Sequence, residues 1–66
     1  MYEKLRELRK SKGYLIEDLA RVIDNSIANY SKKENGLVKF SVTEALEIAD
    51  FLDCKVEDIF LRNDLQ

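Results

Sequence analysis

Apolar side chains recur at helical spacing in five short stretches of the chain. The clearest stripe is formed by Ile16, Leu19, Ala20 and Ile23, which stand at i, i+3, i+4 and i+7. Similar stripes, separated by polar or glycine-containing turns, predict five helices, over residues 2–12, 16–23, 27–33, 42–52 and 56–60. The fold class that this pattern favours is all-α, a compact bundle of five helices.

Cap and turn residues stand between these stretches. Ser26 is a favourable N-cap for the third helix, and Ser41 with Glu44 spells a capping box at the start of the fourth. Gly13 and Gly36 follow the first and third helices, where a left-handed residue is needed to end a helix. The predicted helix boundaries therefore agree with the local turn chemistry.

The chain has 66 residues, enough for a single domain over 1–66. We expect a core over 2–60 and a frayed polar tail over 61–66. Large side chains are assigned by their place relative to the stripes. Those expected in the core are Tyr30, Phe40 and Phe60, those expected at its edges are Tyr2 and Tyr14, and Phe51 is expected to be exposed.

Composition excludes several kinds of site. The chain has no histidine and one cysteine, Cys54, so the commonest general base, the commonest metal ligand and an internal disulfide are all absent. Asp50 and Asp53 would be a surface pair without a pocket, and we expect Cys54 to be a small buried hydrophobe. No apolar run approaches the ~18 residues of a membrane span. We therefore expect a cytoplasmic protein that is not an enzyme and holds no metal or cofactor.

Charge is distributed unevenly along the chain. Residues 1–40 hold nine basic and six acidic side chains, whereas residues 41–66 hold two basic and seven acidic ones, and the whole chain has a net charge of −2. The first part could face phosphate groups. The acidic stretch 44–58 is interpreted as a solvated face, with a docking surface for a basic partner as the alternative.

The second and third predicted helices have the dimensions of a helix-turn-helix. Two helices of about two turns, joined by three polar residues, cross steeply instead of packing side by side. In that motif the second helix lies in the major groove of DNA. Any short polar helix in a small bundle would show the same pattern of residues. The pattern by itself therefore leaves both DNA binding and protein binding open.

A resemblance to a known family favours DNA binding. The stretch YSKKENG at 30–36, together with LRELRKSKG at the start, EDLA at 17–20 and SVTEALEIADFLDCKVEDIF at 41–60, resembles the Cro/CI-type, XRE-like helix-turn-helix regulators of bacteria and phages. The resemblance covers about residues 2–60 and implies a lambda-repressor-like fold. The variant of the motif is similar to regulators carried by phages or prophages of Gram-positive bacteria.

The resemblance also implies which residues contact DNA. Base edges would be contacted by Ile27, Ala28, Asn29 and Lys32, where asparagine suits adenine, lysine suits guanine and apolar groups suit thymine methyls. Asn35 and the 36–39 loop would contact phosphate. Further candidates for phosphate contacts, which position a protein without reading sequence, are Ser31, Lys33, Lys39 and Lys12.

The motif has unusual residues at the start of its second helix and an acidic residue at the end of its third. Leu15 and Ile16 stand where the family usually has a threonine cap and a phosphate-binding glutamine, so Arg9, Lys12 or a backbone amide would have to replace that contact. Glu34 turns inward in the family. Here it is expected to pair with Arg6 or Arg9.

The function implied by these residues is that of a Cro/CI-like repressor. Because one small module makes a limited interface, it is expected to bind a pseudo-palindromic operator in double-stranded DNA as a homodimer. No small-molecule substrate or membrane partner is expected. The alternative is a protein-interaction module of the same fold, of the antitoxin or anti-repressor type.

Overall fold

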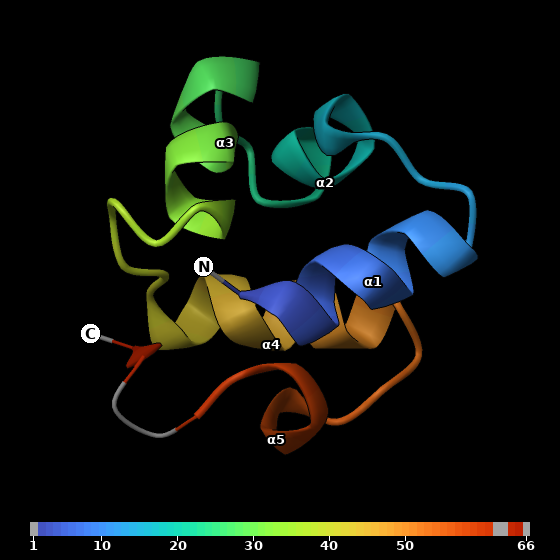
Figure 1. Cartoon of the computed structure of the whole chain (residues 1–66). Helices are drawn as coiled ribbons and strands as arrows, with labels where there is room; N and C mark the ends of the chain where they lie inside the picture. The colour runs from blue at the N-terminus through green and yellow to red at the C-terminus, as the bar shows by residue number, and fades with distance from the viewer. Residues whose placement is uncertain (1, 62–63, 66) are drawn as a thin grey trace.

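Five helices form the part of the chain that the computed structural model describes, residues 2–61 and 64–65. They are α1 (Glu3–Ser11), α2 (Ile16–Val22), α3 (Ile27–Glu34), α4 (Val42–Phe51) and α5 (Val56–Ile59). Each lies within one residue of its predicted bounds, so the predicted all-α fold is confirmed. In the view of Figure 1, α2 and α3 lie on one side of α1 and α4, and α5 lies on the other.

The ends of α1 to α4 are built alike. Each is followed by one residue in the left-handed conformation: Gly13, Asp24, Gly36 and Asp53, with φ between 53° and 84°. After α1, the amide of Gly13 donates to Lys10 and the next amide donates to Arg9. These two hydrogen bonds are the Schellman pattern, which satisfies the last carbonyls of a helix. The two aspartates show that a side chain is tolerated at this position, where glycine is favoured.

The predicted N-caps are also present. The Ser26 hydroxyl accepts a hydrogen bond from the Asn29 amide at 3.1 Å. At the start of α4, the Ser41 hydroxyl accepts from the Glu44 amide, while the Ser41 amide donates to Oε1 of Glu44 at 2.9 Å. The capping box read from the sequence therefore forms in both directions.

The core combines the aliphatic stripes of the helices with a cluster of aromatic rings. Phe40 lies at its centre, with ring centroids 5.4 Å from Tyr2, 6.0 Å from Tyr30 and 5.0 Å from Phe60, all edge to face. Tyr30, Phe40 and Phe60 are buried, as predicted. Phe51 is 40% exposed, as predicted, and its ring centroid lies 4.7 Å from that of Tyr14.

The prediction of a frayed tail is wrong for the tail residues that the structure describes. The Tyr2 hydroxyl donates to the Asp64 carbonyl at 3.1 Å, and Leu65 pairs with Phe40 in a parallel bridge and packs on the core. The Asp64 carboxylate also accepts from the Leu61 amide at 2.7 Å. Most residues of the tail are polar, but Leu65 gives it an apolar anchor. Residues 62, 63 and 66 lie outside the described residues.

A buried ion pair joins α1 to the end of α3. The Arg9 guanidinium donates to both carboxylate oxygens of Glu34, from Nε at 3.1 Å and from Nη2 at 3.0 Å. Its Nη1 donates to the Tyr14 carbonyl at 3.0 Å, so one side chain also holds the loop before α2. Both charged residues are at least 95% buried. Arg9, and not Arg6, is therefore the partner of Glu34.

A second ion pair joins α3 to α4. Lys33 Nζ donates to both oxygens of Glu44, at 2.6 and 2.8 Å, and only about a tenth of its side chain is exposed. Burial alone would raise the pKa of Glu44. The hydrogen bonds from Lys33 and from the Ser41 backbone more than offset that effect, so the pKa of Glu44 is lowered from 4.5.

We expect Arg9→Ala to lower the free energy of unfolding by about 3–5 kcal/mol, because it leaves the Glu34 carboxylate buried without a cation. That loss is comparable to the whole stability of a domain of this size. Thermal unfolding followed by circular dichroism measures it.

The control is Arg21→Ala, which removes the exposed 3.4 Å pair with Asp18 and should cost about 1 kcal/mol or less. An apolar double variant, Arg9→Met with Glu34→Leu, should recover much of the lost stability. An Arg9→Ala protein as stable as wild type would show that the pair does not hold α1 to α3.

The lowered pKa of Glu44 predicts a pH-dependent contribution to stability. Because the folded-state pKa lies below 4.5, the contribution is fully present above that pH and is lost as the pH falls through the lower, folded-state pKa. Urea unfolding should therefore show wild type more stable than Glu44→Gln at pH 7, with the difference shrinking towards pH 3. Glu47→Gln, on an exposed residue of the same helix, is the control and should resemble wild type at pH 7. A difference that does not change with pH would contradict the assignment.

Candidate nucleic-acid interface

The two helices α2 and α3 form the helix-turn-helix that the sequence predicts. They cross instead of running side by side (Figure 1). The turn between them reverses at Asp24, whose φ is 53°, and closes when the Asn25 amide donates to the Ala20 carbonyl at 2.9 Å. Because Ser26 then caps α3, the start of α3 has a defined position relative to α2.

The two faces of α3 differ sharply. Tyr30, Lys33 and Glu34 are buried on the inner face. Burial, followed by the nearby Glu34 carboxylate, raises the pKa of Tyr30 far above 10, so its hydroxyl stays protonated. The outer face is the one that could enter a groove of DNA.

Of the predicted base-contact residues, Ala28 and Lys32 lie on the outer face of α3, while Ile27 and Asn29 lie at its two edges. Ile27 is 55% exposed, Ala28 and Lys32 are exposed, and Asn29 is half-buried. Ala28 and Lys32 are one helical turn apart and so share a face. Small, apolar, amide and ammonium groups are thus presented within the first two turns.

Not all of the predicted phosphate contacts are accessible in the structure. Asn35 and Lys39 are exposed beyond the end of α3, and Ser31 is half-buried, with its hydroxyl 3.5 Å from the side-chain Nδ2 of Asn35. These three remain candidates. Lys33 does not, because its ammonium is bound to Glu44 and is buried, so a phosphate contact would have to break that ion pair.

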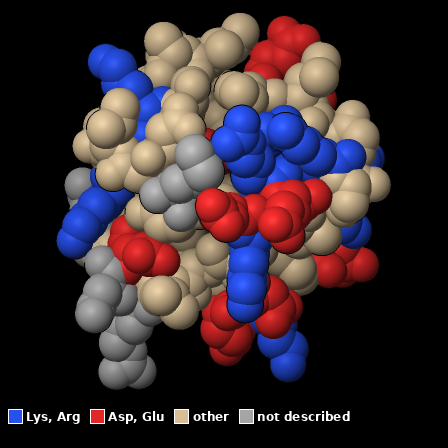
Figure 2. Space-filling model, in the orientation of Figure 1, with Lys and Arg blue, Asp and Glu red and all other residues tan. Residues whose placement is uncertain are grey.

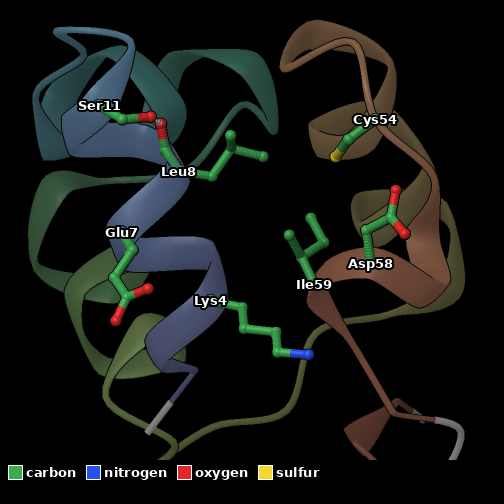
Figure 3. Close-up of a pocket in the computed structure, with 7 residues that line it drawn as sticks. All are labelled: Lys4, Glu7, Leu8, Ser11, Cys54, Asp58 and Ile59. Carbon is green, nitrogen blue, oxygen red and sulfur yellow. Dashed lines mark hydrogen bonds between the residues drawn. The ribbon is translucent and has the colours of Figure 1, made fainter.

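Lys12 also lies away from the outer face of α3. It is close enough to Cys54, beyond α4, for its charge to act on that thiol. Figure 3 shows the neighbouring groove between α1 and α5, into which the side chains of Leu8 and Cys54 point.

The Cys54 thiol is half-buried, as a small hydrophobe at the edge of the core. Burial, followed by the Asp58 carboxylate, raises its pKa, so the reactive thiolate is disfavoured at neutral pH. This environment agrees with a packing role.

Sequence reasoning missed two basic residues on α1. A shallow groove between α1 and the starts of α2 and α3 is lined by Arg6 and Lys10, together with Leu15, Ile16 and Ile27. It is therefore continuous with the outer face of α3. Arg6 and Lys10 are four residues apart on one helix face, and that spacing was the available signal.

The same groove shows what replaces the usual start of α2. Leu15 is 59% exposed and cannot cap the helix through its side chain; instead Asp18 accepts from the Leu15 amide at 2.8 Å. Arg9 cannot supply the missing phosphate contact, because it is buried against Glu34. Lys10, by contrast, is exposed and borders the groove.

Charges are interleaved on the face over α1. Figure 2 shows lysine and arginine side chains directly beside aspartate and glutamate side chains there, without a single basic field. The uneven charge along the sequence thus does not become two clean electrostatic ends on this face.

Neither a membrane-crossing helix nor a metal-binding cluster is found in the described part of the chain. Within residues 2–61 and 64–65, no helix has the length and apolar character needed to cross a membrane. The same residues contain no cluster of three or more side chains placed to bind a metal ion.

Comparison with known proteins agrees with this geometry. The helix-turn-helix family matches residues 5–59, from within α1 to the end of α5. No curated protein matches the chain closely enough to count as a relative. Given the extent of the family match and the arrangement of α2 and α3, the chain belongs to the Cro/CI-type helix-turn-helix family, whose members are DNA-binding domains and not enzymes.

Proposed function

We propose that this domain is a sequence-specific transcriptional regulator that places the outer face of α3 in the major groove of duplex DNA. The observation that supports this function best is the contrast between the faces of α3. Buried ion pairs anchor the inner face, while Ile27, Ala28 and Lys32 are exposed on the outer one. A rigidly held helix with a varied exposed face suits the reading of base edges.

Each residue of the surface has a proposed partner. Lys32 donates to guanine, Asn29 pairs with adenine, and Ile27 and Ala28 pack on thymine methyls. Phosphate is contacted by Ser31, Asn35 and Lys39 on one side of α3 and by Lys10 on the other. Lys33 is excluded because its ammonium is buried against Glu44, and Lys12 because it lies near Cys54, away from the outer face of α3.

We further propose that two copies bind a pseudo-palindromic operator. The described residues measure 26 × 22 × 19 Å. Half-sites one helical turn apart are separated by about 34–36 Å, so two copies fit side by side on one face of DNA without overlap. Blocking access to a promoter is the simplest outcome for such a small domain, hence a cytoplasmic Cro/CI-like repressor. The YSKKENG variant of the motif supports a phage or prophage origin.

The alternative is a protein-interaction module of the same fold. It is favoured by the exposed apolar side chains of Leu15 and Ile27, and by Ile16, which stands where the family usually has a phosphate-binding glutamine. An amide chemical-shift titration with random-sequence duplex at low and raised salt separates the two. DNA binding predicts shifts in residues 25–40 and at the start of α2 that salt reverses. Absent shifts, or shifts centred on 44–58, would support the alternative.

The proposed roles of two lysines predict different losses. Lys32→Ala should reduce the preference for a selected duplex over a scrambled one, because a base contact is removed. Lys39→Ala should weaken both duplexes alike and make the log–log salt slope shallower by about 0.9, the value for one phosphate. Fluorescence anisotropy at several salt concentrations measures both effects.

Lys55→Ala is the charge-matched control, because Lys55 is exposed at the start of α5, outside the proposed surface. It should leave the preference and the salt slope close to wild type. Loss of affinity in Lys55→Ala equal to that in Lys39→Ala would show that net charge, and not this surface, determines binding.

A further inference from the structure

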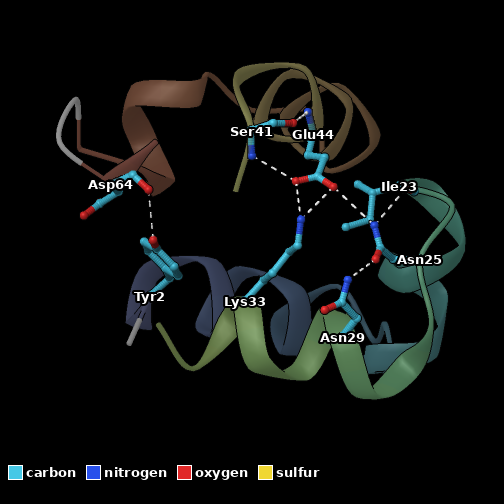
Figure 4. Close-up of polar contacts among 8 residues, drawn as sticks. All are labelled: Tyr2, Ile23, Asn25, Asn29, Lys33, Ser41, Glu44 and Asp64. Atoms are coloured by element: carbon cyan, nitrogen blue, oxygen red, sulfur yellow. Dashed lines mark hydrogen bonds and ion pairs between the residues drawn. The ribbon is translucent and has the colours of Figure 1, made fainter. Parts of the chain in front are cut away.

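A chain of side-chain amides connects the outer face of α3 to the first turn of α4. Asn29 Nδ2 donates to Oδ1 of Asn25, in the turn before α3. Asn25 Nδ2 in turn donates to Glu44 Oε2 at 3.2 Å and to the Ile23 carbonyl at 3.4 Å. Figure 4 shows these side chains in line, from Asn29 through Asn25 to Glu44.

The carboxylate at the end of this chain sets the direction of every hydrogen bond in it. An ionised carboxylate only accepts hydrogen bonds, so Asn25 must turn its NH₂ group towards Glu44. The side-chain oxygen of Asn25, Oδ1, then faces Asn29. Because Oδ1 can only accept, Asn29 must donate to it from its own NH₂ group. Without the carboxylate, only the longer hydrogen bond to the Ile23 carbonyl would favour this orientation of the Asn25 amide, whose two ends have nearly the same shape.

Glu44 is itself held from two sides. Lys33 Nζ reaches both of its oxygens, and the Ser41 amide donates to Oε1. Only 15% of the Glu44 side chain is exposed. The carboxylate is therefore a fixed reference point behind α3.

The orientation of the Asn29 amide determines which hydrogen-bonding groups it presents to a base. One Nδ2 hydrogen is used by Asn25, which leaves the second hydrogen and the Oδ1 oxygen. Those two groups form the donor and acceptor pair that matches N7 and the N6 amino group of adenine. An overturned Asn29 amide would present them in exchanged positions.

We propose that Glu44 is a positioning residue for base selectivity, acting through Asn25 to orient the Asn29 amide. The inference rests on the proposed function, in which Asn29 reads a base. It adds a residue on α4, outside the DNA-facing surface, to those that determine the sequence preference.

The test starts from a duplex selected by the wild-type protein from a randomised library. Asn29→Ala identifies the base pair that Asn29 reads, as the position where its preference is lost. Anisotropy then gives the ratio of affinities for the selected duplex and for one substituted at that base pair. We expect a ratio of about tenfold or more for wild type and near one for Asn29→Ala.

Two variants break the relay at different points. Glu44→Gln can donate as well as accept, and Asn25→Ala removes the relay but keeps the Glu44–Lys33 pair. Both should lower the ratio to within about threefold of one. Ser41→Ala is the matched control: it removes the cap hydroxyl, yet the Ser41 backbone still donates to Glu44, so the ratio should stay at the wild-type value. Circular dichroism shows whether each variant is folded. If Glu44→Gln does not fold, the ratio measured for Asn25→Ala tests the positioning role.

The outcomes separate the inference from the function beneath it. A wild-type ratio in a folded Glu44→Gln or Asn25→Ala would overturn the positioning role while leaving DNA reading by Asn29 intact. No lost position in Asn29→Ala would overturn the inference but not DNA binding. Wild-type protein that shows no salt-sensitive binding to any duplex would overturn the proposed function and the inference together.

Discussion

The position of the proposed recognition helix depends on the buried contact between Arg9 and Glu34. A guanidinium and a carboxylate are costly to remove from water, so the pair is stable only with its hydrogen bonds complete. Here the fork of Arg9 meets both carboxylate oxygens, and its remaining nitrogen reaches the Tyr14 carbonyl. One contact thereby ties together α1, the loop before α2 and the end of α3. Because Glu34 lies on the inner face of α3, this contact also fixes the direction in which the outer face points.

The same physical logic places Lys33 on the inside. A lysine in the last turn of a polar helix resembles a phosphate contact when only the sequence is read. In the fold, Glu44 offers Lys33 two oxygens and Phe40 offers a ring face, with Nζ 5.9 Å from the ring centroid. Two ion pairs therefore anchor the inner face of α3: Glu34 binds it to α1, and Lys33 binds it to α4. The positive charge available to DNA is correspondingly smaller than the sequence count indicates.

The surface left for a partner is modest and mixed. Exposed apolar groups such as Leu15 and Ile27 lie beside Lys10 and the outer face of α3. Such a surface gains less from phosphate attraction and more from shape and direct contacts than a strongly basic one. Accurate placement of polar groups such as the Asn29 amide is then more important. That is where the network reaching back to Glu44 contributes.

The sequence by itself determined the helices, their caps and the crossing of α2 and α3. Periodicity, Ser26, Ser41 and the left-handed glycines act within a few residues of one another, so local chemistry is sufficient to read them. It also identified the outer face of α3, because a helix presents residues such as Ala28 and Lys32 together wherever it packs. The resemblance added the inward turn of Glu34.

Only the tertiary structure decided which charged groups were already engaged. In the fold, Arg9 and not Arg6 pairs with Glu34, and Lys33 is buried against Glu44. Lys12 lies near Cys54, and Lys10 lines the same groove as Ile27. The tertiary structure also anchored the tail through Leu65 on Phe40. Each of these outcomes joins residues distant in the chain, and long side chains can reach several partners. Which one they meet depends on how the helices pack, and local patterns do not encode that.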